Sequence, residues 1–165
     1  MLSVTSTLGN IYSDRRLSEK YRRMEATGNC ERLLISRMEM EKFRLRRKTD
    51  RGTDLGIVLE PGSRLHHGDV LVLTKDRLVL VEQLPEKVVS IRIGISRNGI
   101  GMAALVGHAI GNRHRPIAIN RTTISFPVQA AAEVALFQEL LPHDVKLRFE
   151  EQIFHPSGEF HSHEH

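Results

Sequence analysis

The sequence predicts an α+β protein, with a β-rich N-terminal part, a following part of mixed helices and strands, and a short polar tail. The first half of the 165 residues consists of short alternating segments separated by turn residues. After Leu84-Pro85, two longer segments show the spacing of apolar residues that is typical of helices. After Phe154 the chain becomes polar, and four of its nine histidines fall in the last eleven residues. We therefore expect domains at 1–84 and 85–154 and a flexible histidine-rich tail at 155–165.

The N-terminal part is expected to be a small sandwich or barrel. Residues 31–48 alternate between apolar and charged positions, with one break between Ile35 and Met38 that we interpret as a bulge or a change of strand. Turn residues separate further expected strands at 55–59, 70–73 and 78–81. A short helix is expected at 15–25.

The second part predicts the order β-α-β-β-α-β, which is the ferredoxin-like arrangement. The expected elements are a strand at 88–95, a helix at 100–110, strands at 116–119 and 122–126, a helix at 130–141 and a strand at 146–153. Gly111 and Asn112 suit the left-handed turn that follows a helix. The helix at 100–110 has more apolar residues than one small sheet face requires, so it is our candidate for contact with a second copy of the chain; these residues are Met102, Leu105, Val106 and Ile110.

Composition indicates a cytoplasmic protein that does not span a membrane. No apolar run approaches the length needed to cross a bilayer, and no secretory signal is evident at the start. A single cysteine, Cys30, excludes an intrachain disulfide and fits a reducing compartment, so we interpret it as structural. The net charge of +4 is concentrated in the first fifty residues and fits either an acidic partner or nucleic acid.

The tail histidines are the first signal for a metal. His161, His163 and His165 alternate, so in an extended chain their imidazoles lie on one side and can converge on one ion. Neutral imidazole suits nickel, copper, zinc and iron. Without a neighbouring thiolate, the pattern disfavours Cu(I) and structural zinc.

His114 is the second signal, because Gly111-Asn112-Arg113-His114-Arg115-Pro116 forms a corner from which a histidine projects. His108 and His155 are possible additional ligands, whereas adjacent His66 and His67 chelate one ion poorly and are interpreted as turn residues. No nucleophile with a recognisable elbow and no H-E-x-x-H motif occurs, so we do not expect an enzyme.

Three motifs and the tail resemble a known family. Arg47-Lys48-Thr49-Asp50-Arg51-Gly52-Thr53, then Leu65-His66-His67-Gly68-Asp69-Val70-Leu71, then Gly111-Asn112-Arg113-His114 and the histidine-rich end occur in the order seen in urease accessory protein E, the nickel metallochaperone of urease maturation. The resemblance covers nearly the whole chain. The chain lacks a histidine pair that some members carry about fourteen and sixteen residues after the last motif.

The resemblance implies a peptide-binding N-terminal domain and a ferredoxin-like metal-binding domain that forms a homodimer. It implies that His114 of each protomer binds a shared nickel ion and that His161, His163 and His165 add ligands, although zinc or copper accept the same residues. The implied partners are the urease accessory GTPase and the apo-urease complex.

A nucleic-acid-binding module is the alternative function, because ferredoxin-like domains often bind RNA and the first part is basic. Such modules stack bases on aromatic side chains of the sheet. Aromatic residues make up 5% of this chain and there is no tryptophan, which disfavours that alternative.

Overall fold

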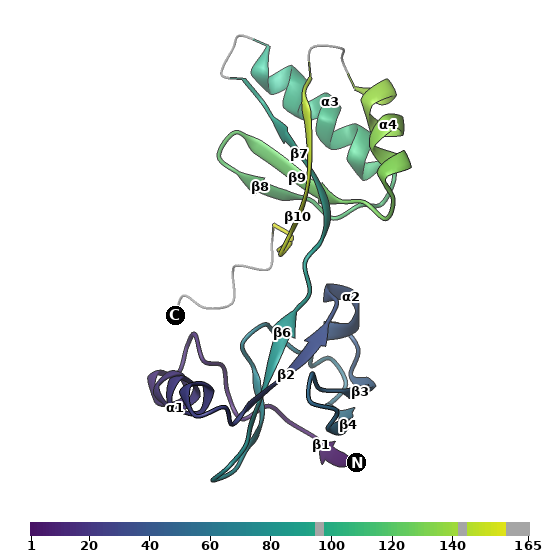
Figure 1. Cartoon of the computed structure of the whole chain (residues 1–165). Helices are drawn as coiled ribbons and strands as arrows, with labels where there is room; N and C mark the ends of the chain where they lie inside the picture. Colours follow the sequence, from purple (N-terminus) through teal and green to yellow (C-terminus); the bar gives the residue numbers. More distant parts are fainter. Residues whose placement is uncertain (95–97, 142–144, 158–165) are drawn as a thin grey trace. The chain divides into compact units, whose positions relative to one another are not determined.

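The computed structural model describes residues 1–94, 98–141 and 145–157. The chain divides into two compact units, Met1–Leu84 and Pro85–His165, called unit 1 and unit 2 below (Figure 1). Both contain helices and sheets, so the predicted α+β class is confirmed. Among the described helices, none combines the length and apolar character that crossing a membrane requires.

Unit 1 contains two three-stranded sheets that share one core. The first has the order β1-β4-β3, formed by Leu2–Val4, Asp54–Val58 and Arg44–Lys48. The second has the order β2-β6-β5, formed by Cys30–Ile35, Leu78–Gln83 and Val70–Leu73. Leu33 and Val79 of the second sheet pack in one cluster with Leu55 and Ile57 of the first, so the apolar faces of the two sheets are buried together.

The opposite face of the β2-β6-β5 sheet is covered by helix α1, Arg15–Ala26. Leu17 and Met24 of this helix share a second buried cluster with Leu78 and Leu80 of β6. Cys30 lies in the same cluster as a free, buried thiol, and burial raises its pKa.

The break in the alternating segment 31–48 is the expected change of strand, made by a short helix, and not a bulge. Residues Arg37–Met40 form the one-turn helix α2 between β2 and β3. Ser36 and Glu39 form a reciprocal capping box: the Glu39 backbone N–H donates to Ser36 Oγ, and the Ser36 N–H donates to the Glu39 carboxylate. The pattern Ser-x-x-Glu at residues 36–39 is the sequence signature of such a helix start.

The motif after β3 serves the fold of unit 1. The Arg32 N–H of β2 donates to the Asp50 carboxylate at 2.8 Å, and the Asp50 N–H donates to the Arg32 carbonyl. The Thr49 hydroxyl donates to the buried Glu31 carboxylate at 2.7 Å, and Arg77 pairs with the same carboxylate. These bonds attach the β3–β4 turn to the second sheet.

Unit 2 has one antiparallel sheet with the strand order β10-β7-β9-β8. The elements along the chain are β7 Glu86–Arg92, α3 Gly99–Gly111, β8 Ala118–Asn120, β9 Thr123–Pro127, α4 Ala131–Leu140 and β10 Leu147–Gln152. Both helices cover the same face of the sheet (Figure 1). Val89 and Phe126 of the sheet pack there against Ile110 of α3 and Phe137 of α4.

The apolar surplus of helix α3 is smaller than expected. Val106 and Ile110 are fully buried in the core of unit 2, and Met102 packs partly against it. Ile100 and Leu105 remain exposed, at 88% and 57%. Because five residues along an α-helix rotate by about 140°, these two side chains lie on different sides of α3, and Leu105 is the exposed one of the four residues expected to contact a second copy.

Candidate metal centre

His114 lies on an exposed corner directly after helix α3. Its backbone φ is 52°, in the left-handed region that residues other than glycine seldom adopt. Its N–H donates to the Gly111 carbonyl at 2.9 Å, which closes the turn. We expected Gly111 and Asn112 to take the left-handed turn; instead Gly111 ends the helix and Asn112 is right-handed, so the strained position is His114 itself.

Two arginines hold the His114 corner against helix α4. The Arg113 guanidinium lies over the Phe137 ring, 5.4 Å from its centroid. Arg115 pairs with Glu133 at 2.6 Å, and both side chains are about three-quarters buried. Glu133 also accepts the N–H of Gln129 at 3.0 Å, just before α4 begins. A left-handed residue is stable only when its surroundings fix it, and these contacts do so.

The chain after β10 returns to the edge strand that follows His114. The Ser157 N–H donates to the Ile117 carbonyl at 2.7 Å, and the Ile119 N–H donates to Ser157 Oγ at 2.6 Å. Ile117 is three residues from His114. Ser157 is the last residue that the structure describes, so the start of the tail is fixed on β8 close in sequence to the corner.

The other predicted metal ligands, His161, His163 and His165, lie outside the described residues, as does His143. Within the described ranges, no three His, Cys, Asp or Glu side chains are grouped so that they could hold a metal ion.

His108 and His155 are not brought together with His114 by any contact in the described part of unit 2. His108 Nε2 lies 2.9 Å from Asn112 Nδ2, one turn along the same helix. His155 is exposed and lines a cleft on the sheet face opposite the helices.

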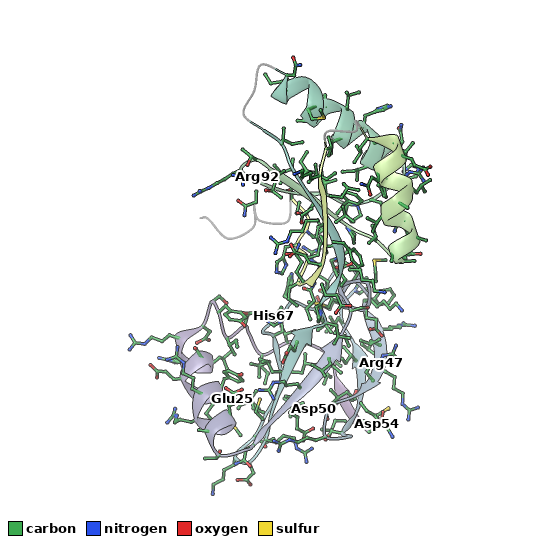
Figure 2. All side chains as sticks on the ribbon, turned by 45° about the horizontal axis from the view of Figure 1, so that its top comes forward. Glu25, Arg47, Asp50, Asp54, His67 and Arg92 are labelled. Atoms are coloured by element: carbon green, nitrogen blue, oxygen red, sulfur yellow. The ribbon has the colours of Figure 1, made fainter. Side chains whose placement is uncertain are left out.

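His67 is structural, which sequence reasoning did not predict beyond its place in a turn (Figure 2). The Gln83 backbone N–H donates to His67 Nδ1 at 3.1 Å, so this nitrogen carries no proton. In the neutral ring the proton is then on Nε2, which lies 3.0 Å from Tyr12 Oη. The ring also stacks on Tyr12, with centroids 5.5 Å apart. With both nitrogens engaged, His67 has no lone pair available for a metal.

His66 has a different environment from its neighbour. Its Nδ1 lies 3.6 Å from the Asp69 carboxylate, and the hydrogen bond to this group raises the pKa of His66. Asp69 is itself buried, and it also accepts the His66 backbone N–H and the Asn10 side-chain N–H. The pair therefore closes the turn before β5.

Comparison with known proteins identifies the family. The model of the UreE urease accessory protein N-terminal domain matches residues 5–84. A urease accessory protein UreE of Natronomonas pharaonis is 33% identical over 177 residues, which cover 99% of this chain and 81% of the relative. The UreE 1 of Pseudomonas syringae pv. tomato is 28% identical, covering 86% of this chain and 93% of the relative. The UreE of Geobacillus kaustophilus is 30% identical, covering 81% and 87%. The chain therefore belongs to the UreE family of urease accessory proteins and is an accessory protein, not an enzyme.

Proposed function

We propose that this protein is a metallochaperone that binds Ni(II) and delivers it for assembly of the urease active site. The observation that carries the proposal is the His114 corner, where an exposed imidazole is held in a strained conformation by two arginine contacts. An outlier of this kind costs about 1–3 kcal/mol and is typical of functional positions. Imidazole is a suitable nickel ligand, and zinc or copper would accept the same donor.

His161, His163 and His165 complete the proposed site. Ser157 is hydrogen-bonded to β8, and Ile117 is three residues from His114. An extended chain covers at most about 3.5 Å per residue, so four residues from Ser157 to His161 span about 14 Å, and three residues from Ile117 to His114 span about 11 Å. The tail is therefore long enough for its histidines to reach the corner.

We further propose that the protein is a cytoplasmic homodimer in which His114 of both protomers binds one ion. Unit 2 would supply the contact as the ferredoxin-like domain, 85–154, with the β-rich domain at 1–84 and the histidine-rich tail at 155–165. The exposed Ile100 and Leu105 of α3 support this assignment, because they offer apolar area to a partner. The recipients would be the urease accessory GTPase and, through it, apo-urease.

The test is calorimetry with Ni(II) on the full-length protein. His114→Ala is expected to remove the tightest site without unfolding the protein, because an exposed side chain leaves no cavity. Replacing the three tail histidines by alanine is expected to weaken binding or lower the ion count without abolishing it. His66→Ala is the matched control, since it removes an exposed imidazole in unit 1. Full nickel affinity in His114→Ala would refute the proposed site.

Dimerisation gives an independent test. If both protomers contribute His114 to one ion, nickel must tighten the dimer by the same free energy with which the dimer tightens nickel binding. Sedimentation of the wild-type protein at low concentration should show a nickel-dependent shift towards dimer, and His114→Ala should cancel it. A monomer that binds nickel with undiminished affinity would refute the shared site.

A nucleic-acid-binding function is not favoured. Phe126 is buried beneath the helices, and Phe149 is 42% exposed on the strand β10. Base recognition on a sheet relies on several exposed aromatic rings.

A further inference from the structure

The face of the unit 2 sheet that the helices do not cover contains an open cleft of about 1020 Å³. Its central strands contribute small polar side chains: Ser90 Oγ of β7 lies 2.9 Å from Ser125 Oγ of β9. Thr123 and Asn120 line the end of the cleft near the β8–β9 turn. These hydroxyl and amide groups can donate hydrogen bonds to an anion.

Strand register places positive charges side by side at this end. Arg92, labelled in Figure 2, pairs with Thr123, and Arg148 pairs with Ser90. Both arginines therefore lie on the open face and line the cleft. Leu147 pairs with Ile91, so Lys146, the preceding residue, continues the antiparallel register opposite Arg92. Like charges directly opposite each other on a sheet are destabilising, so the arrangement has a cost to folding.

A fourth cation, Arg121, lines the same end and adds a second unfavourable feature. Arg121 occupies the β8–β9 turn with a φ of 53°. Asn and Gly are the usual residues at such turn positions because they adopt positive φ at little cost. His114 and Arg121 are the two non-glycine residues with positive φ within the ranges that the structure describes.

The charge at this end is not balanced locally. Arg148, whose side chain is 79% exposed, forms an ion pair at 3.2 Å with Glu150, which lines the same cleft, so one of the four cations has a carboxylate partner there. In the described part of the chain, no carboxylate forms an ion pair with Arg92, Arg121 or Lys146. Unit 2 as a whole contains eight Lys or Arg and eight Asp or Glu, so the positive end is a local concentration and not a consequence of net charge.

We propose that this cationic end of the open face is a docking surface for an acidic, carboxylate-rich segment of a partner protein. Four cations above a floor of hydroxyl and amide groups are complementary to closely spaced carboxylates. The described lining offers nucleic acid little to stack on, because Phe154 is 2% exposed and His155 is its one exposed ring. Ser157 lines the same cleft, so a docked segment would lie beside the start of the tail. The proposal does not depend on nickel binding.

The test uses hexaglutamate as the probe and the isotope-labelled full-length protein. Amide resonances at 90–92 and 123–125 are expected to shift on titration at moderate salt. The double variant Arg92→Gln/Lys146→Gln should lower the affinity at least about tenfold, since each lost charge contact weakens binding. Arg16→Gln/Arg22→Gln, which removes the same charge from exposed positions on α1, is the matched control and should change the affinity less than about twofold.

Stability gives a second measurement that separates docking from misfolding. Because Arg92 and Lys146 repel each other, their replacement should raise the melting temperature of unit 2 by about 1–5 °C. A lower melting temperature in the Arg92→Gln/Lys146→Gln variant would show that these two side chains do not destabilise the fold by repulsion. If the α1 control lowers the affinity for hexaglutamate equally, the peptide responds only to the net charge of the protein. Tighter binding of hexauridylate at the same amides would assign the face to nucleic acid, and identical shifts with inorganic phosphate would assign it to small anions; each of these outcomes overturns the proposal.

Discussion

Replacing Glu133 by alanine is expected to weaken nickel binding through His114, a residue that Glu133 does not touch. The Arg115–Glu133 pair, at 2.6 Å, joins the corner to helix α4. Losing this charge-assisted hydrogen bond should cost about 1.5 kcal/mol of stability, and losing a carboxylate from the first turn of α4 about 0.5 kcal/mol more. Released from the pair, His114 is expected to relax from its left-handed conformation.

Nickel must then restore that conformation on binding. A left-handed backbone costs a non-glycine residue about 1–2 kcal/mol, which corresponds to a loss of affinity of about five- to thirtyfold. Calorimetry with Ni(II) on the folded variant, below its melting temperature, measures this loss. Glu133→Gln has a single oxygen, which can accept the Gln129 N–H but then presents an amide NH2 group to Arg115, so it should lose affinity as Glu133→Ala does. Glu150→Gln breaks an exposed ion pair elsewhere in unit 2 and should have no effect. If Glu133→Ala loses stability and yet keeps full nickel affinity, the pair supports the fold and does not position His114.

Four further results are expected. Ser157→Pro, which removes both the N–H bonded to Ile117 and the hydroxyl bonded to Ile119, should lower nickel affinity about twofold. The free tether to His161 then lengthens from four residues to the seven that follow buried Phe154, and effective concentration falls as the three-halves power of length; the effect should vanish once the tail histidines are replaced. His67→Ala should destabilise unit 1 by about 1–2 kcal/mol and leave nickel affinity unchanged, as measured by thermal melts and calorimetry. The pKa of His66 is raised in the folded state, so its contribution to the free energy of unfolding is fully present below the unfolded pKa and is lost as pH rises through the folded pKa. The difference in stability between wild type and His66→Gln, measured by urea titration, should therefore shrink from pH 6 to pH 8. Bound nickel should be released as pH falls through about 6.5, since imidazole must be neutral to coordinate; retention well below that pH would indicate carboxylate ligands.

The elements that sequence reasoning predicted well are those whose signal is local. Helices α3 and α4 carry apolar residues at helical spacing over ten residues or more, and each differs from its predicted range by one residue at each end. The strands of unit 1 that lie between turn residues are likewise indicated by neighbouring residues in the sequence. Strand β1, Leu2–Val4, was missed because three residues have no measurable period, and its parallel pairing with β4 joins segments about fifty residues apart.

The candidate site shows the same division. A projecting histidine after α3 follows from the local sequence, but the strained backbone of His114 does not, because Asn112 is the better left-handed residue by intrinsic preference. The contacts that override this preference come from Phe137 and Glu133, about twenty residues further along the chain. Similarly, the structural role of His67 depends on Tyr12, fifty-five residues away.

The arrangement of the corner bears on how a carrier can release its metal. An enzyme holds its metal with several rigid protein ligands, each oriented by further hydrogen bonds. At the corner, by contrast, the supporting contacts come from the flanking arginines and leave the His114 imidazole exposed. Under the proposed function, a ligand fixed in this way would offer a constant first contact for an ion, while the tail histidines would leave it one at a time. If the tail starts at Ser157 beside β8, a recipient bound at the open face of the same sheet would meet those donors as they detach. Transfer would then require exchange of single imidazoles and no opening of the fold.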